Sequence, residues 1–182
     1  MSLEKNQPNP YLTLCQVAGS CILAGAAFGA VSNMIDGAIS PYYFKTVMHW
    51  DFPDIWTAAV SQGLFEGLIY GTIFSIIFTT GFGLITKGKA GYGFAFTQLL
   101  KTIGFIGICW LCGGLFAILL TSINPDFYRK LFPITPKDGI EMLKFAWTGG
   151  SIWGGMIGGL LSSFLAVVML KNRWLQSQET EE

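Results

Sequence analysis

Charged side chains are scarce in this sequence, and their scarcity excludes a water-soluble globular protein. Asp, Glu, Lys and Arg make up 12% of the 182 residues, whereas an ordinary soluble domain carries roughly 25%. Hydrophobic residues make up 52%, and the mean hydropathy is +0.51. The net charge is zero and the sequence has no basic block, so nothing in it indicates nucleic-acid binding.

Side chains that carry chemistry are also scarce. His49 is the single histidine, and no neighbour in the sequence suggests a metal site around it. Since a hydrolase needs a nucleophile, a base and an orienting group, we expect no enzyme activity and no bound metal or cofactor. Cys109 and Cys112 form a Cys-x-x-Cys pattern, which in soluble proteins indicates redox or zinc chemistry. Inside an apolar window with no second pair, packing of small side chains explains it better.

Four long windows contain no charged residue at all. A helix needs about 20 apolar residues to cross the hydrocarbon core of a membrane, and each window is long enough. The first window is too long for a cleavable signal peptide, and Glu4-Lys5 before it has no net positive charge. We therefore predict an all-α integral membrane protein with four transmembrane helices. The charge-free windows are 6–35, 67–86, 102–125 and 145–170.

The chain also contains an internal repeat. A shift of 88 positions aligns the first window with the third, and a shift of 87 aligns the second with the fourth. A shift of 84 aligns the loops that follow the first and third windows. Glycine-rich helices match by chance in some proteins, but the same order across two helices and a loop favours duplication. We predict one membrane domain over 1–182, with repeat one at about 11–86 and repeat two at about 92–171.

Each predicted repeat consists of a helix, a long loop and a second helix. Two spans return the chain to its starting side, so the two repeats have the same orientation. Such parallel repeats are related by a pseudo-two-fold axis along the membrane normal. We expect the four helices to form one bundle with a quasi-symmetric centre.

The long loops carry signals for short helices at the membrane surface. Ser40-Pro41 and Asn124-Pro125 each place a capping residue before a proline at the first helical position. Aromatic residues in these loops suit the headgroup layer of the bilayer. We predict lipid anchoring by this surface, with docking of a protein partner as the alternative. The predicted anchors are Tyr42, Tyr43, Trp50, Trp56, Phe127 and Tyr128.

The segment from Ile39 to Phe44, Ile-Ser-Pro-Tyr-Tyr-Phe, resembles a family of uncharacterised bacterial polytopic membrane proteins with an Ile-Ser-Pro-x-Tyr-Phe stretch. Those proteins have a histidine where this chain has Ile35 and a glutamate where it has Tyr42. The resemblance covers residues 35–44. It implies a bacterial inner-membrane origin and adds no catalytic residue.

Glycines recur every four residues in the predicted spans. Such rows let helix backbones approach closely in a membrane, where hydrophobicity drives little association between helices. The second and fourth spans carry the longest rows at equivalent positions, so we expect these two helices to cross closely at the pseudo-symmetry axis. Association with a protein partner or a second copy is the alternative use of these faces. The rows are Gly63, Gly67 and Gly71, and Gly150, Gly154 and Gly158.

Glu66 is the one acidic residue deep within a predicted span. It lies about 10 residues, or roughly 13–15 Å, into a helix that begins near 53–57. An ionisable group there indicates function by default, and Gln62 and Tyr70 share its helix face at i−4 and i+4. The equivalent position of the second repeat holds Trp153, so a symmetric ion path would be half missing. A protonated, purely structural glutamate is the alternative.

Both termini lie on one side of a four-span protein. Six cations fall on that side and five on the other, which slightly favours cytoplasmic termini under the positive-inside rule. The final segment, 176–182, is a polar tail that we expect to be disordered.

Close-packing helix faces are abundant and reactive groups are nearly absent. The sequence therefore predicts a non-enzymatic membrane protein that acts as a structural or accessory subunit. The alternative is a small channel or carrier with Glu66 in an intramembrane polar path. A membrane enzyme or redox protein that uses Cys109 and Cys112 is a third, weaker hypothesis.

Overall fold

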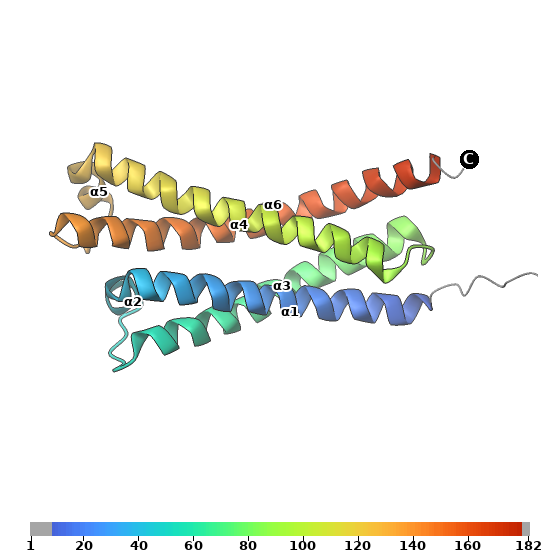
Figure 1. The fold of residues 1–182 in the computed structure, drawn as a ribbon, viewed down its shortest axis with the longest axis horizontal. Coiled ribbons are helices and arrows are strands. Elements are labelled where there is room, and N and C mark those ends of the chain that lie inside the picture. Colours follow the sequence, from blue (N-terminus) through green and yellow to red (C-terminus); the bar gives the residue numbers. More distant parts are fainter. Residues whose placement is uncertain (1–8, 180–182) are drawn as a thin grey trace, which may run out of the picture.

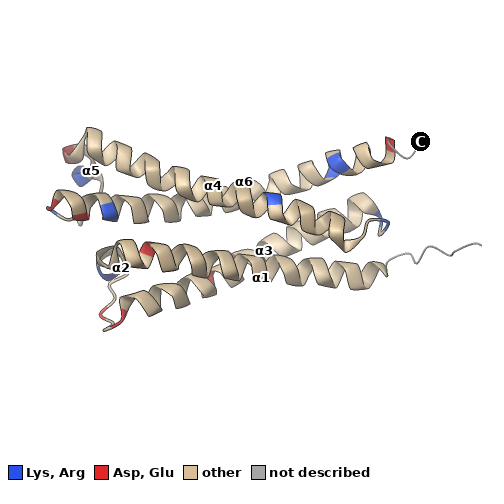
Figure 2. Ribbon diagram, viewed as in Figure 1, with Lys and Arg blue, Asp and Glu red and all other residues tan. Residues whose placement is uncertain are grey.

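The computed structural model describes residues 9–179 as a bundle of four long helices and two short ones (Figure 1). Each long helix is long and apolar enough to cross a membrane, so the chain is a multi-pass integral membrane protein. Most charged residues gather at the two ends of the bundle (Figure 2). The helices are α1 (Pro10–Ile39), α2 (Pro41–Val47), α3 (Ile55–Thr86), α4 (Tyr92–Ile123), α5 (Pro125–Leu131) and α6 (Gly139–Glu179).

The order long, short, long occurs twice along the chain. We call α1 to α3 the first hairpin and α4 to α6 the second, because α1 packs mainly against α3 and α4 mainly against α6. Figure 1 shows α2 and α5 together at one end of the bundle, while α1 begins and α6 ends at the other. The two hairpins therefore point the same way, as the sequence predicts. The duplication itself stays a prediction.

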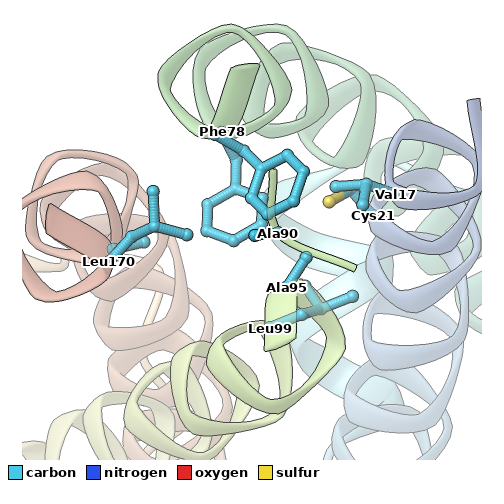
Figure 3. Close-up of a cluster of buried hydrophobic side chains, with 9 residues drawn as sticks. Val17, Cys21, Phe78, Ala90, Ala95, Leu99 and Leu170 are labelled. Atoms are coloured by element: carbon cyan, nitrogen blue, oxygen red, sulfur yellow. The ribbon is translucent and has the colours of Figure 1, made fainter. Parts of the chain in front are cut away.

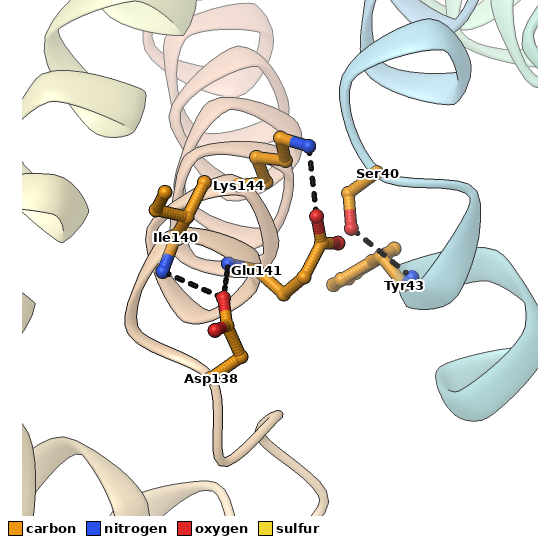
Figure 4. A network of polar contacts seen from close by, with 6 residues as sticks. All are labelled: Ser40, Tyr43, Asp138, Ile140, Glu141 and Lys144. Carbon is orange, nitrogen blue, oxygen red and sulfur yellow. Dashed lines mark hydrogen bonds and ion pairs between the residues drawn. The ribbon is translucent and has the colours of Figure 1, made fainter.

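Local sequence explains where the short helices begin. The Ser40 side chain accepts a hydrogen bond from the Tyr43 amide at 3.3 Å, and Asn124 accepts one from Phe127 at 3.0 Å. Both helices then open with proline, whose fixed φ suits the first turn. Figure 4 shows the Ser40 cap beside a second one, in which Asp138 begins α6 by accepting from two amides. The predicted capping signals are thus confirmed.

The glycine rows pack inside each hairpin. A Cβ at Gly67 would overlap the carbonyl oxygen of Gly25, and one at Gly154 would overlap the carbonyl oxygen of Cys109. The backbones of α3 and α6 therefore lie directly against those of α1 and α4. The expectation that the rows of the second and fourth spans meet each other is wrong, and these faces are occupied within the chain.

Two apolar clusters fill the ends of the bundle. The first cluster lies toward the termini and takes side chains from all four long helices (Figure 3). The second lies around α2 and α5 and contains Phe44, Tyr128 and Phe145. The first cluster consists of Val17, Cys21, Phe78, Phe82, Ala90, Ala95, Leu99, Ala166 and Leu170.

The end of the chain differs from expectation. Helix α6 continues to Glu179, so residues 176–179 are helical rather than disordered. Residues 180–182, the remainder of the predicted tail, lie outside the described part of the chain. Helix α4 begins at Tyr92, before the third charge-free window, so Lys101 lies within this helix.

Candidate functional site

The predicted polar face of α3, formed by Gln62, Glu66 and Tyr70, is present in part. Gln62 Nε2 donates a hydrogen bond to Glu66 Oε1 at 2.7 Å, as the i, i+4 spacing predicts. Tyr70 lies one turn further along, is exposed, and lines the same cavity as Glu66. The other carboxyl oxygen of Glu66, Oε2, accepts no hydrogen bond from the described residues.

Glu66 and Tyr70 line a cavity of about 190 Å³ in the middle of the bundle. All four long helices contribute to its wall, so the cavity lies at the boundary between the two hairpins. Most of the lining side chains are apolar. Those that the following argument uses are Ala24 and Phe28 of α1, Glu66, Tyr70 and Ile73 of α3, Ile103, Ile106 and Trp110 of α4, and Met156, Gly159 and Leu160 of α6.

Buried side chains close the bundle at both ends of this cavity. Toward the termini, the first apolar cluster brings Phe78 and Phe82 together with Leu170, and none of the three is more than 1% exposed. Toward α2 and α5, the indole of Trp110 lines the cavity and hydrogen-bonds to the buried Asp36. Within residues 9–179, buried side chains therefore lie between the cavity and each end of the bundle.

Asp36 is the polar centre of the contact between the two hairpins. Its carboxyl group accepts hydrogen bonds from Trp110 Nε1 at 3.2 Å, Trp147 Nε1 at 3.2 Å and Ser151 Oγ at 2.9 Å. Thr148 donates to the Asp36 backbone carbonyl at 3.4 Å. Four donors of the second hairpin thus converge on one fully buried residue of α1.

Asp36 directly follows the first charge-free window, where a polar residue at a helix end is ordinary, so the sequence alone does not indicate this role. The available signal was an acid at the end of a long charge-free window, one turn before Ser40-Pro41. Trp110, Trp147 and Ser151 are more than 70 residues away in the chain. A single sequence does not show that they meet Asp36.

Two of the predicted lipid anchors lie inside the protein instead. Tyr43 is 7% exposed and Tyr128 is 4% exposed, and both belong to the second apolar cluster. Burial raises the pKa of Tyr128 to about 12. It also raises the pKa of Tyr43, and the nearby acids Asp36 and Glu66 add to that rise. Because both rings are buried within the protein, the prediction of lipid anchoring is wrong for these two residues.

The other predicted anchors remain available at the surface. Tyr42, Trp56 and Phe127 are exposed, so their role in lipid contact stays a prediction. The Trp56 indole also donates to the Met34 carbonyl at 3.1 Å, which ties the start of α3 to the end of α1. Trp50 is half-buried and stacks on Phe44, with ring centroids 5.6 Å apart.

The cysteine pair does not form a shared site. Cys109 faces Gly158 across the contact between α4 and α6, while Cys112 is exposed. Within residues 9–179, no three potential metal-ligating side chains lie together. The packing interpretation of Cys109 therefore agrees with its position.

Comparisons with protein-family models, curated proteins and solved structures gave no match to this chain.

Proposed function

We propose that the protein is a small, non-enzymatic carrier that binds its cargo in the central cavity, with Glu66 as the binding group. The position of Glu66 supports this proposal: the residue lines a cavity at the boundary of the two hairpins. An ionisable side chain within a membrane span is costly to maintain and indicates function by default. The carrier was the second of the two functions that the sequence predicted.

The packing of the hairpins favours a carrier. Backbone contact at glycines joins α1 to α3 and α4 to α6, so each hairpin is expected to behave as a rigid body. In many carriers built from two repeats, substrate binds between the repeats and one repeat rocks against the other. The closed ends of the bundle favour such a mechanism over a continuous channel.

Flux through reconstituted vesicles tests the carrier. The vesicles would contain a pH-sensitive dye for protons, and tritiated tetramethylammonium would report the movement of a small organic cation. We expect one of these fluxes with the wild-type protein and at least a tenfold loss with Glu66→Gln, because the amide carries no charge.

The same change at Glu179, exposed at the end of α6, is the matched control and should leave the flux unchanged. Wild-type protein that moves neither probe, or Glu66→Gln protein that moves both at the wild-type rate, contradicts the carrier.

An accessory subunit is the second candidate, and the surface around α2 and α5 favours it. Several large apolar side chains are exposed there, among them Phe52, Phe127, Phe132 and Ile134. Such a patch fits a protein partner as well as it fits lipid. A partner that co-purifies in fixed stoichiometry in mild detergent, together with the absence of flux, supports this second function over the first.

A further inference from the structure

We infer that the central cavity binds an amphiphilic cation, a protonated amine on a small hydrocarbon body, which enters from the lipid phase between α3 and α6. This inference rests on the proposed function, because it names the class of cargo and the access route for the same cavity. It is carried by the exposure of the lining residues, the chemistry of the wall and the size of the space.

The exposed part of the wall lies on α3 and α6. Tyr70 and Ile73 of α3 are 45% and 48% exposed, and Met156 and Leu160 of α6 are 36% and 59% exposed. All four side chains line the cavity, so the cavity reaches the surface between these two helices. Ile73 and Leu160 lie near the middle of their helices, where the surroundings are hydrocarbon.

The wall on α1 and α4 is less exposed than the wall on α3 and α6. Ala24 and Phe28 of α1 and Ile103 and Ile106 of α4 line the wall there, and each of them is half-buried. The two ends are closed by the first apolar cluster and by the Trp110–Asp36 contact. A ligand that enters between α3 and α6 therefore comes from the bilayer rather than from water.

The chemistry of the wall selects a cation with an apolar body. Glu66 is the one carboxyl group among the lining residues, and these residues include no Lys, Arg or His. Because Gln62 donates a hydrogen bond to Glu66 Oε1, the other carboxyl oxygen, Oε2, is the atom that would bind a ligand. In surroundings of low dielectric constant, a carboxylate attracts an ammonium group strongly, while the remaining apolar wall matches a hydrocarbon group. A neutral lipid chain would offer no donor to Glu66 Oε2.

The size of the space limits the ligand. A dry cavity of about 150 Å³ is known to admit benzene, and this cavity has about 190 Å³. It thus accommodates one aromatic ring or a short alkyl chain, with the amine at Glu66. A phospholipid does not fit as a whole.

Binding of phenethylamine tests the inference directly. The protein would be placed in phosphatidylcholine nanodiscs, tritiated phenethylamine measured at equilibrium, and empty nanodiscs used to subtract partitioning into lipid. We expect saturable binding, weakened at least tenfold by Glu66→Gln because a charge-assisted hydrogen bond is lost. Ethylbenzene, the neutral analogue, should compete weakly and equally in both proteins. Equal phenethylamine affinity in the two proteins overturns the inference.

Filling the cavity provides a second test. Gly159 lines the cavity, and a Cβ built there meets no atom within 4 Å, so Gly159→Leu places its side chain in the open space. Gly104 is equally unobstructed but does not line the cavity, and Gly104→Leu is the matched control. We expect Gly159→Leu to abolish phenethylamine binding and Gly104→Leu to preserve it. Unchanged phenethylamine binding by Gly159→Leu overturns the assignment of the central cavity as the binding site.

A third pair of variants tests the access route. Ile73 is exposed and lines the cavity, whereas Ile76 is 64% exposed and does not line it. Ile73→Trp should slow phenethylamine association several-fold, while Ile76→Trp should leave the rate unchanged. Equal rates in these two variants overturn access between α3 and α6. Both variants keep Glu66, so they remain informative if Gly159→Leu fails to fold.

Failure of the inference is distinguishable from failure of the carrier. Saturable phenethylamine binding that depends on Glu66, without any flux in vesicles, supports the ligand class and contradicts transport. Flux of protons or tetramethylammonium that depends on Glu66, without phenethylamine binding, supports the carrier and overturns the ligand class.

Discussion

Two indole groups and a hydroxyl meet at the Asp36 carboxyl group. All three donors belong to the second hairpin, whereas Asp36 belongs to the first. Removing the acceptor would leave the two half-buried indole N–H groups without a partner, whereas the Ser151 hydroxyl also donates to the Thr148 carbonyl at 3.0 Å. A donor left unpaired inside a protein costs about 1–3 kcal/mol. This single side chain therefore contributes a large part of the specific contact between the hairpins.

We predict that Asp36→Ala destabilises the protein by on the order of 3 kcal/mol, because the Trp110 and Trp147 indoles lose their acceptor. Asp36→Asn should cost less, since it keeps one acceptor oxygen. Asp51→Ala, an exposed acid in the loop before α3, is the control and should leave stability unchanged. Thermal unfolding in detergent, followed by circular dichroism, measures all three. A melting temperature for Asp36→Ala equal to that of Asp51→Ala contradicts the bridging role.

Tyr43 and Tyr128 show the limit of residue-level prediction in a membrane protein. Tyrosine near a predicted helix end suits the headgroup layer and a buried cluster equally well. Here both rings pack inward, and Tyr43 contacts Phe145 with ring centroids 5.2 Å apart. The deciding partner, Phe145, lies a hundred residues away in the chain.

At the scale of elements, glycine marks the faces at which the long helices pack closely. The spacing of four identifies a face that permits close backbone contact, and this part of the prediction agrees with the structure. The spacing does not identify the partner helix, because any helix with small residues at matching depth fits such a face. Chain connectivity then favours the other long helix of the same hairpin, so the row on α3 packs against α1 and the row on α6 packs against α4.

We predict that Gly67→Ala weakens the contact between α1 and α3. The added methyl group would overlap the Gly25 backbone, which cannot move aside as a flexible side chain does. Overpacking of this kind costs about 1–3 kcal/mol. Gly104→Ala, with nothing within 4 Å of its Cβ, should be neutral or slightly stabilising. Thermal unfolding in detergent distinguishes them, and equal melting temperatures contradict the proposed contact.

The short helices were predictable because their signals are local. Each has a side-chain cap and a proline within two residues, and such a pattern acts without tertiary contacts. The Gln62–Glu66 hydrogen bond was predictable for the same reason, since both residues lie one turn apart on one helix. The cavity beside them needs four helices and was not predictable.

For the molecule as a whole, the distribution of charge bears on its orientation. The end with α2 and α5 carries nearly balanced charge, whereas cations outnumber acids among the described residues at the opposite end, with Lys87, Lys89, Lys171 and Arg173 against Glu179 (Figure 2). Cationic loops favour the cytoplasmic side. We propose that both chain ends face the cytoplasm.

Cysteine labelling in whole cells tests this orientation. The native cysteines would first be replaced by serine, and a single cysteine placed at Asp51 or at Arg173. A maleimide that cannot cross membranes should label Asp51→Cys in intact cells and Arg173→Cys after the cells are opened. The reverse pattern contradicts cytoplasmic termini.

The amino-acid sequence by itself determined that the chain lies in a membrane, how many times it crosses, and where its short helices begin. Those properties follow from hydropathy along the chain and from caps that act over a few residues. Only the tertiary structure decided which faces of the helices meet, that Asp36 joins the hairpins, and that Glu66 lines a cavity between them. The reason is physical: apolar helices in a bilayer gain little from hydrophobicity when they associate, so steric fit and a few distant polar contacts select their arrangement.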